Sequence, residues 1–290
     1  MAHLRRPVKA PFPPALPFRH ASPTHVGYIE RVVNDAITND PPVLFFSDAH
    51  LGAHPPDREA VKADRFVGFL QYAAQIKAEV FFVGDLFDYW FEYRHWIPKV
   101  PIRILSAIRE FTIRGGTFHM LLGNHDIWAA DYFTEELGVH VHREDLSITR
   151  QGLRVLISHG DGKARSDRGY RILKRILRYK PNITLYRLLP ADWAYSLADF
   201  FSRRSRRLTS SRPPRFLQEY DAVAATCIDA GYDAVIMGHI HQGWVRRLGN
   251  GWWVNSGEFF ERFSYVRLEN GEFHLKTWNP VPGSSTSPSE

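Results

Sequence analysis

The sequence predicts an α/β protein whose largely parallel sheet is interrupted by a helical insertion. From about Pro42 onwards, short runs of β-branched and aromatic residues alternate with helical patterns. Strands separated by helices pair in parallel, and their helices cover both faces of the sheet. A basic, amphipathic segment over about residues 165–212 breaks this series and is expected to form a helical insertion that stands over the sheet. With 290 residues, 44% of them hydrophobic, the chain can bury a sizeable core.

The individual elements follow from local patterns. Short apolar runs predict five buried strands, over residues 43–47, 78–84, 117–123, 153–160 and 232–239. The spacing of apolar residues predicts helices from Asp57 to about Ile76 and around Ile102–Ile113. Later, Asn250-Gly251 between two strand-like runs predicts a type I′ hairpin, and further strands are expected over 263–268 and 272–278.

The excess positive charge of the chain lies in the insertion. The formal net charge is +6, and residues 165–215 alone contain fourteen Lys and Arg against three Asp and Glu. In RGYRILKRILRYK the apolar residues share one helix face and basic residues occupy most of the rest, and LADFFSRRSRR predicts a second helix. Such a segment favours an anionic partner: nucleic acid, an acidic membrane surface or a phosphorylated ligand. The alternative is a basic helical hairpin that merely packs on the sheet.

Composition also limits the class of protein and its organisation. The single cysteine, Cys227, excludes an intrachain disulfide and thiolate-rich metal sites, and it fits a reducing compartment. No run approaches the ~20 apolar residues of a membrane-spanning helix. We expect an extended N-terminal arm over residues 1–40, one globular domain over 41–279 and a disordered tail over 280–290.

Asp, Asn or His follows each of the five predicted buried strands. The segments are DAH (48–50), GDLFD (84–88), GNHD (123–126), HGD (159–161) and GHIH (238–241). One such residue is usually a turn former or a helix cap, but five parallel strand ends share the edge where α/β sheets place their sites. Asp48 and His50, like His239 and His241, are one residue apart, so in extended backbone the side chains of each pair point the same way.

These strand ends predict a metal centre. Seven close Asp, Asn and His side chains would include two carboxylates, which metal charge would hold together. Oxygen and imidazole ligands without sulfur suit Mn²⁺, Fe²⁺ or Zn²⁺. Seven ligands exceed the needs of one ion, so we expect two divalent ions that share a bridging carboxylate. Two such ions are suited to displacement at phosphorus, because they lower the pKa of a bridging water and stabilise the transition-state oxygens.

The motifs D-x-H, G-D, G-N-H-D, H-G-D and G-H-x-H, in this order, resemble the calcineurin-like metallophosphoesterases over roughly residues 43–260. The resemblance implies a four-layer α/β/β/α sandwich with the helical lid as an insertion. It implies that Asp85 bridges two metal ions, for which Mn²⁺ is expected and Fe²⁺ or Zn²⁺ are the alternatives. His125 is similar to the non-ligand histidine of the family, which contacts the phosphate and protonates the leaving group. The implied ligands are Asp48, His50, Asp85 and His241 for one ion, and Asp85, Asn124, His159 and His239 for the other.

Two longer stretches, GDLFDYWFEY and HGDGKARSDRGYRILKRILRYKP, resemble the UDP-2,3-diacylglucosamine diphosphatases of the lipid A pathway. In that subfamily the lid covers the sugar and the acyl chains. The resemblance places Asp167 and Tyr170 on sugar-contacting positions and Arg204 among the basic lid residues that bind substrate. One position departs from the pattern, since His125 stands where the subfamily typically has Arg.

The expected function is therefore metal-dependent cleavage of the pyrophosphate of UDP-2,3-diacylglucosamine, to UMP and 2,3-diacylglucosamine 1-phosphate. Because of His125, a phosphodiesterase or phosphatase of broader specificity stays open, as does a non-catalytic scaffold that binds membranes or nucleic acid. The expected partners are the lipid-linked nucleotide sugar and an anionic membrane surface, at the cytoplasmic face of a bacterial inner membrane. Nucleic acid is disfavoured, because the few aromatic residues of the insertion are not spaced as a base-stacking platform. No protein partner is inferred.

Overall fold

Two β-sheets and the helices beside them make up the described part of the protein. The computed structural model describes residues 40–209 and 215–279, with the backbone alone for 201–209 and 215. The expected N-terminal arm up to residue 39, the 210–212 end of the insertion and the expected tail over 280–290 lie outside the described residues. The boundaries of these segments therefore stay predictions.

Parallel strands form the centre of both sheets. The six-stranded sheet has the order β11-β10-β1-β2-β3-β4, with β1 to β4 parallel and β10 and β11 antiparallel. The five-stranded sheet has the order β5-β6-β7-β9-β8, with β6, β7 and β9 parallel and an antiparallel strand at each edge. The strands are β1 (Val43–Phe46), β2 (Glu79–Val83), β3 (Phe118–Leu121), β4 (His140–His142), β5 (Leu146–Arg150), β6 (Leu153–Ser158), β7 (Ala234–Met237), β8 (Gly243–Leu248), β9 (Gly251–Ser256), β10 (Ser264–Glu269) and β11 (Glu272–Thr277).

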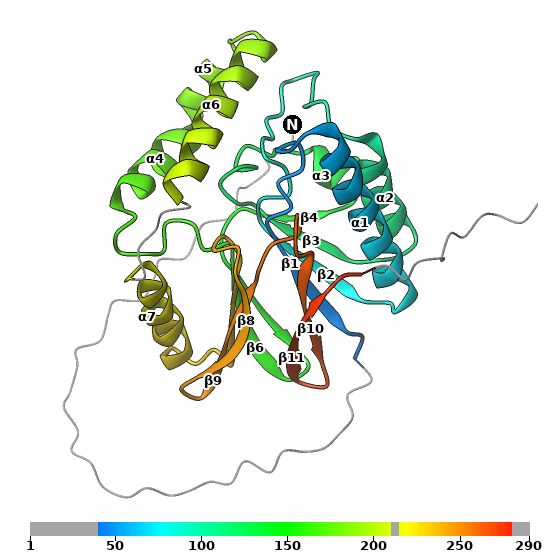
Figure 1. Cartoon of the computed structure of the whole chain (residues 1–290), viewed down its shortest axis with the longest axis vertical. Coiled ribbons are helices and arrows are strands. Elements are labelled where there is room, and N and C mark those ends of the chain that lie inside the picture. The colour runs from blue at the N-terminus through cyan, green and yellow to red at the C-terminus, as the bar shows by residue number, and fades with distance from the viewer. Residues whose placement is uncertain (1–39, 210–214, 280–290) are drawn as a thin grey trace, which may run out of the picture. The chain divides into compact units, whose positions relative to one another are not determined.

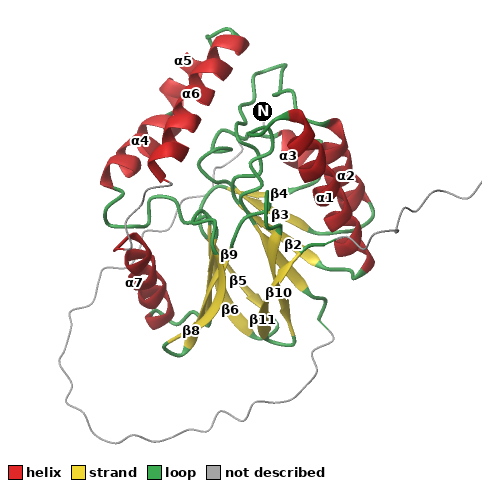
Figure 2. Ribbon diagram, viewed as in Figure 1, coloured by secondary structure: helices red, strands yellow, loops and turns green. Residues whose placement is uncertain are grey.

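Helices cover the outer face of each sheet, as Figures 1 and 2 show. Helices α1 (Pro56–Gln75), α2 (Ile102–Ile113) and the short α3 (Tyr132–Glu135) pack on the six-stranded sheet, and α7 (Arg215–Asp229) packs on the five-stranded sheet. A third apolar cluster lies between the two sheets. The expected four-layer α/β/β/α sandwich is confirmed, and the five predicted buried strands are divided between its two sheets.

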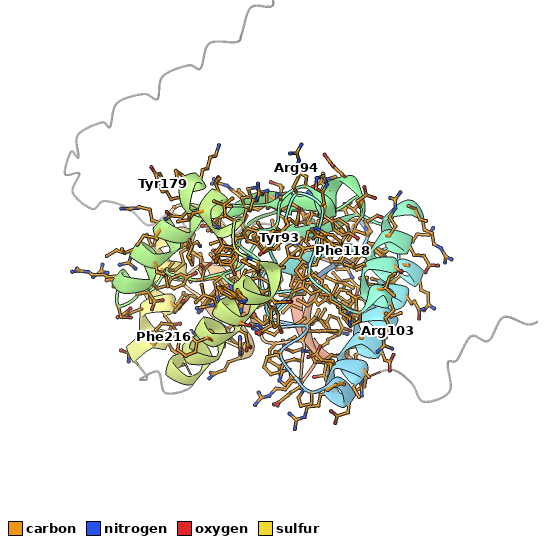
Figure 3. All side chains as sticks on the ribbon, turned by 90° about the horizontal axis from the view of Figure 1, so that it is seen from above. Tyr93, Arg94, Arg103, Phe118, Tyr179 and Phe216 are labelled. Carbon is orange, nitrogen blue, oxygen red and sulfur yellow. The ribbon has the colours of Figure 1, made fainter. Side chains whose placement is uncertain are left out.

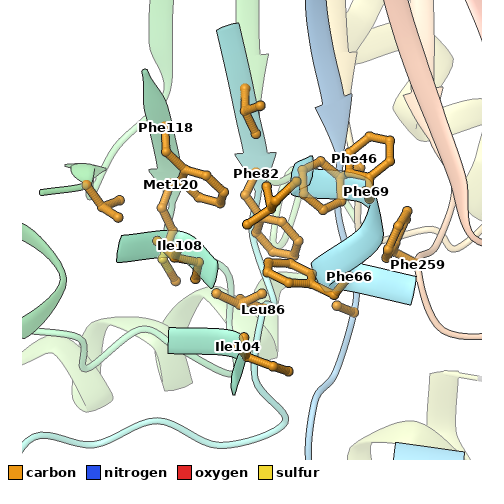
Figure 4. Packing of buried hydrophobic residues seen from close by; sticks show 14 of the residues in the cluster. Phe46, Phe66, Phe69, Phe82, Leu86, Ile104, Ile108, Phe118, Met120 and Phe259 are labelled. Atoms are coloured by element: carbon orange, nitrogen blue, oxygen red, sulfur yellow. The ribbon is translucent and has the colours of Figure 1, made fainter. Parts of the chain in front are cut away.

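Strand β1 shows why its sequence is apolar without alternation. Val43 and Phe45 belong to the cluster between the sheets, whereas Leu44 and Phe46 belong to the cluster under α1 and α2. Successive side chains of a strand point to opposite faces, so a strand covered on both sides is apolar at every position. Figure 4 shows Phe46 among the rings of the cluster under α1 and α2. The centroid of the Phe46 ring lies 4.8 Å from that of the Phe69 ring.

The predicted type I′ turn between β8 and β9 is wrong. Leu248 pairs with Gly251, so the two turn residues are Gly249 and Asn250 instead of the Asn-Gly pair. A type I′ turn needs positive φ at both central residues, but here Gly249 has a φ of 56° and Asn250 has a negative φ. Glycine takes the left-handed position without a steric cost, and the pairing shifts by one residue accordingly.

The described part of the insertion, up to residue 209, contains three helices instead of the two expected. They are α4 (Arg168–Arg178), α5 (Lys180–Tyr186) and α6 (Ala191–Thr209), and Figure 1 shows them grouped apart from the two helical layers. Pro181 lies in the first turn of α5, and Pro190 directly precedes α6. Proline is tolerated where a helix starts because the first N–H groups have no intrahelical partner. Every helix of the described ranges is too short or too polar to cross a membrane.

A polar cluster joins the two sheets at one side. Glu79 of β2 accepts hydrogen bonds from Arg150 of β5 at 2.5 and 2.7 Å and from His119 of β3 at 3.0 Å. Nδ1 of His119 lies 3.0 Å from Nε2 of His142. Burial opposes the charge of Glu79, but its hydrogen bonds with Arg150 and His119 lower its pKa to about 2. Burial, together with the charges of His119 and His140, lowers the pKa of His142 to about 4.

We expect His142 to contribute to acid destabilisation between pH values of about 6.5 and 4. In this window the unfolded chain, with an ordinary histidine pKa of about 6.5, binds a proton that the folded chain does not, so acid favours unfolding. His142→Asn should make the free energy of unfolding less dependent on pH, measured by urea denaturation at about pH 7 and about pH 5. The exposed His274 provides the control, since His274→Asn should keep the wild-type dependence. An unchanged dependence in His142→Asn contradicts this account.

Candidate metal centre

The polar residues that follow the strands meet at one end of the two sheets. The loops after β1, β2 and β3 come from the six-stranded sheet, and those after β6 and β7 come from the five-stranded sheet. Carboxyl ends of parallel strands from both sheets therefore supply one site. The side chains brought together are Asp48, His50, Asp85, Asp88, Asn124, His125, His159, His239 and His241.

Five of these residues have left-handed backbone, so the expectation of extended pairs is wrong. Their φ angles are 54° for Asp48, 41° for His50, 61° for Asp85, 66° for His239 and 59° for His241. Residues with a side chain rarely adopt this conformation, and each costs roughly 1–3 kcal/mol unless the surroundings over-determine it. The sharp turn at each strand end brings Asp48 and His50 into one group of potential ligands, but it directs His239 and His241 into different groups.

Two glycines allow the loops to approach one another. A Cβ atom at Gly84 would overlap the ring of His159, and one at Gly123 would overlap the carboxylate of Asp85. Only glycine therefore fits at either position without moving a neighbouring candidate ligand.

Asp48, His50 and His241 form the first group of potential metal ligands. One donor atom of each lies within 4.8 Å of the others. Nε2 of His241 lies 3.3 Å from Nε2 of His50 and 3.2 Å from Oδ1 of Asp48. Although both imidazoles lie close to it, this buried Oδ1 atom accepts no hydrogen bond of regular geometry within the described residues. Because buried polar atoms are normally satisfied, the orphaned oxygen fits a cation at this position.

Asp85, His159 and His239 form the second group. Oδ2 of Asp85 lies 3.3 Å from Nε2 of His159 and 3.8 Å from Nε2 of His50 in the first group. Its carboxylate therefore faces both groups, which fits the bridging role that was expected for it. Oδ1 of Asn124 lies 3.3 Å from Nε2 of His159 and adds an oxygen donor.

Two buried carboxylates dominate the electrostatics of the site. Burial opposes the charges of Asp48 and Asp85, but the neighbouring histidines hold the pKa of each carboxyl well below its usual range. Burial likewise opposes the charge of His50, yet the nearby carboxylates of Asp48, Asp88 and Asp85 raise its pKa to about 10. Buried anions need positive partners, and oxygen and imidazole donors without sulfur suit Mn²⁺, Fe²⁺ or Zn²⁺. The residues present therefore fit two divalent ions.

His125 lies beside both groups and contacts Asp85 through its backbone. Its N–H donates to Oδ1 of Asp85 at 2.9 Å, and its ring Nδ1 donates to the carbonyl of Asp88 at 2.8 Å. Asp88 thus orients the ring of His125 through its carbonyl. Its Oδ1 lies 3.5 Å from Nδ1 of His125 and 3.6 Å from Nδ1 of His50, and these three side chains make a further group that could hold a metal ion. No role was predicted for Asp88. The signal for it in the sequence is its place three residues after Asp85 on the same loop.

Residues 41–243 match the family model of the calcineurin-like phosphoesterases. The chain belongs to this family. A UDP-2,3-diacylglucosamine hydrolase from Porphyromonas gingivalis is 37% identical over 172 residues, which are 59% of this chain and 65%, less than two thirds, of that protein. A protein of the same name from Photorhabdus laumondii is 30% identical over 208 residues, covering 71% of this chain and 84% of that protein. Another, from Nitrosococcus oceani, is 27% identical over 201 residues, with coverages of 69% and 78%.

Asp161 connects the phosphoesterase centre to the insertion. This buried carboxylate lies two residues after His159, and its Oδ2 accepts a hydrogen bond from the hydroxyl of Tyr170 at 2.5 Å. Nζ of Lys174 lies 2.7 Å from the same oxygen. Burial and the charge of Asp161 raise the pKa of the Tyr170 hydroxyl, which therefore stays protonated. Tyr170 reaches the edge of the site, with its hydroxyl bound to Asp161.

The other two predicted substrate-binding residues also belong to the insertion. Asp167 is half-buried immediately before α4, where its carbonyl accepts the N–H of Arg171. Arg204 lies in α6, and its side chain is outside the described residues. The substrate-binding roles of Asp167, Tyr170 and Arg204 stay predictions.

Two alanine variants should separate ligation from catalysis. Asp85→Ala should lose both ions, because its carboxylate faces both ligand groups. His125→Ala should keep the wild-type metal content and lose about 10²–10⁴ in rate, the usual size of an acid–base contribution. Elemental analysis gives the metal content, and hydrolysis of bis-p-nitrophenyl phosphate with Mn²⁺ gives the rate. Loss of metal from the His125→Ala variant would show that His125 is itself a metal ligand.

Proposed function

We propose that this phosphoesterase is a dinuclear metal-dependent hydrolase that cleaves the pyrophosphate of UDP-2,3-diacylglucosamine, releasing UMP and 2,3-diacylglucosamine 1-phosphate. The names of the relatives from Porphyromonas, Photorhabdus and Nitrosococcus support this substrate. The observation that carries the proposal is the direct link, through Asp161, between the metal centre and an insertion that exposes apolar and basic residues. The metal centre suits the phosphate groups of a phosphorylated lipid, and the exposed residues of the insertion suit its acyl chains.

The metal ligands divide into two sets around Asp85. One set is Asp48, His50, Asp85 and His241, and the other is Asp85, Asn124, His159 and His239. When bound, two divalent ions lower the pKa of a water molecule and neutralise charge on the phosphate oxygens. Mn²⁺ is the ion that we propose, with Fe²⁺ and Zn²⁺ as alternatives that the same donors accept.

His125 is the proposed catalytic acid. Because its Nδ1 donates to the carbonyl of Asp88, Nε2 is the atom that would exchange a proton with the substrate or its leaving group. The hydrogen bond from its backbone to Asp85 holds it against the bridging carboxylate. His125 can thus approach the scissile bond without serving as a ligand.

The helices of the insertion expose apolar side chains that suit acyl chains. On α4, Ile172 is 60% exposed and Ile176 is 50% exposed, with Lys174 and Arg175 between them. Groups of exposed apolar side chains are typical of surfaces that bind lipids, membranes or other proteins. Figure 3 shows Tyr179, which is 60% exposed, at the outer edge of these helices. Further exposed apolar residues of the insertion are Leu173, Leu185, Leu188, Trp193, Tyr195, Leu197 and Phe200.

The same surface supports peripheral binding to an anionic membrane. Apolar side chains can enter the boundary between headgroups and acyl chains while neighbouring cations bind acidic headgroups. The concentration of Lys and Arg over residues 165–215 supplies these cations. We place the protein at the cytoplasmic face of a bacterial inner membrane, where a lipid-linked nucleotide sugar is accessible.

A broader phosphodiesterase or phosphatase is the second candidate. His125, at a position where the diphosphatase subfamily typically has Arg, favours it. The pairing of His125 with Asp88 is made by the loops after β3 and β2, so the pair can act on any phosphate ester that reaches it. A non-catalytic scaffold is disfavoured, because each strand end supplies its predicted donor to the site.

Comparative hydrolysis tests the substrate. With Mn²⁺, the kcat/KM for UDP-2,3-diacylglucosamine should exceed that for bis-p-nitrophenyl phosphate by at least about 100-fold, because binding of the sugar and acyl chains contributes to the transition state. Removal of metal should abolish both activities, and refilling with Mn²⁺, Fe²⁺ or Zn²⁺ identifies the preferred ion. Equal turnover of the two substrates would support the broader phosphoesterase instead.

The role of the insertion can be tested on α4. A double variant, Ile172→Ser with Ile176→Ser, should lower kcat/KM for the lipid at least ~10-fold through lost apolar contact. It should also reduce sedimentation with phosphatidylglycerol vesicles. Hydrolysis of bis-p-nitrophenyl phosphate should not change. Ile113→Ser, at the end of α2 where the side chain is 62% exposed, is the matched control. An equal loss on both substrates argues against a lid that binds lipid.

A further inference from the structure

A lysine is buried beside the metal centre. Lys62 of α1 is only 2% exposed, although a buried ammonium is costly unless it is paired and hydrogen-bonded. Its Nζ donates to the carbonyl of His50 at 2.6 Å and to Oε1 of Glu59 at 2.7 Å. It also lies 3.2 Å from Nδ1 of His54. These contacts direct the lysine at the loop that carries His50.

Glu59, one turn earlier on α1, binds the same loop. Its Oε2 accepts the backbone N–H of Gly52 at 2.8 Å, and its Oε1 accepts the N–H of His54 at 3.0 Å. Glu59 and Lys62 therefore bind the backbone at residues 50, 52 and 54. We call this pair of side chains the α1 clamp.

The backbone of His50 is in a conformation that needs such support. Its φ of 41° lies in the left-handed region, which persists where the surroundings over-determine it. The N–H of His50 donates to the carbonyl of Asp85 at 3.1 Å, and its carbonyl accepts from Lys62 on the other side. Both backbone polar groups of His50 are thus held, and the ring direction follows from them.

The positive charge of Lys62 lies where it would weaken the binding of a metal ion. An ammonium bound to the carbonyl of a metal ligand repels a cation at that site. For metal affinity, charge alone would therefore favour a neutral residue at position 62. The hydrogen bonds that hold the loop after β1 instead require the lysine. We propose that Lys62 is a positioning residue that, together with Glu59, holds the loop Leu51–His54 so that His50 presents Nε2 to the metal centre. This inference rests on the proposed role of His50 as a ligand.

Metal titration of the full-length chain tests the clamp. Lys62→Met keeps the aliphatic stem and removes the ammonium, and we expect Mn²⁺ to bind at least ~10-fold more weakly by calorimetry, the usual loss for an outer residue that orients a ligand. If only charge mattered, the same variant would bind Mn²⁺ more tightly. Wild-type or tighter binding by a folded Lys62→Met protein overturns the proposal. At saturating Mn²⁺, kcat for bis-p-nitrophenyl phosphate should recover towards the wild-type value.

Three further variants make the outcome decisive. Arg58→Met removes a charge from the first turn of α1, where the side chain is 65% exposed, and should leave Mn²⁺ affinity unchanged. If Lys62→Met does not fold, Glu59→Ala carries the test, and an unchanged affinity in it overturns the clamp. His50→Ala separates the two hypotheses. Unchanged Mn²⁺ binding in His50→Ala rejects the proposed metal function itself, whereas weakened binding there with wild-type binding in Lys62→Met rejects only the clamp.

Discussion

Two carboxylates, Asp48 and Asp85, are buried where the loops of the two sheets meet, and their charge constrains the structure around them. Buried anions without compensating partners would cost far more than a domain can tolerate. Histidines from both sheets surround them, and the N–H groups of His125 and His239 donate to Asp85 and Asp48 respectively. A site that gathers positive partners around two anions is also one that accepts divalent ions.

This arrangement depends on a rigid frame, because the ligand loops adopt backbone conformations that they would not hold alone. The apolar clusters on both faces of the six-stranded sheet fix β1 and β2, whose ends carry Asp48 and Asp85. From outside the sheet, α1 adds the contacts of Lys62 and Glu59 with the loop after β1. Strain in the loops is therefore balanced by packing and by hydrogen bonds contributed from other elements.

The helices of the insertion differ from those of the sandwich in how far their side chains are buried. No side chain of α4 or α5 is fully buried, and many of their apolar residues remain exposed. The insertion is attached near the metal centre by Tyr170 and Lys174 on Asp161, and by the ring of Tyr186 against that of Phe91. A surface attached at these points but left uncovered suits a ligand that supplies the missing apolar contact.

The order of apolar strands and polar strand ends in the sequence was sufficient to predict the parallel strands and the residues that meet at the centre, whereas the four layers were expected from the resemblance of the motifs to the calcineurin-like metallophosphoesterases. That pattern is local, since a strand buried on both faces must be apolar and parallel strand ends must share an edge. The left-handed backbone of Asp48, His50 and His239, the orienting contacts of Asp88 and the clamp of Lys62 could not be predicted in the same way. They arise from contacts between elements that are distant in the chain or from turns whose strain is stabilised elsewhere. Only the tertiary structure, which brings α1, β1 and β2 together, decides them.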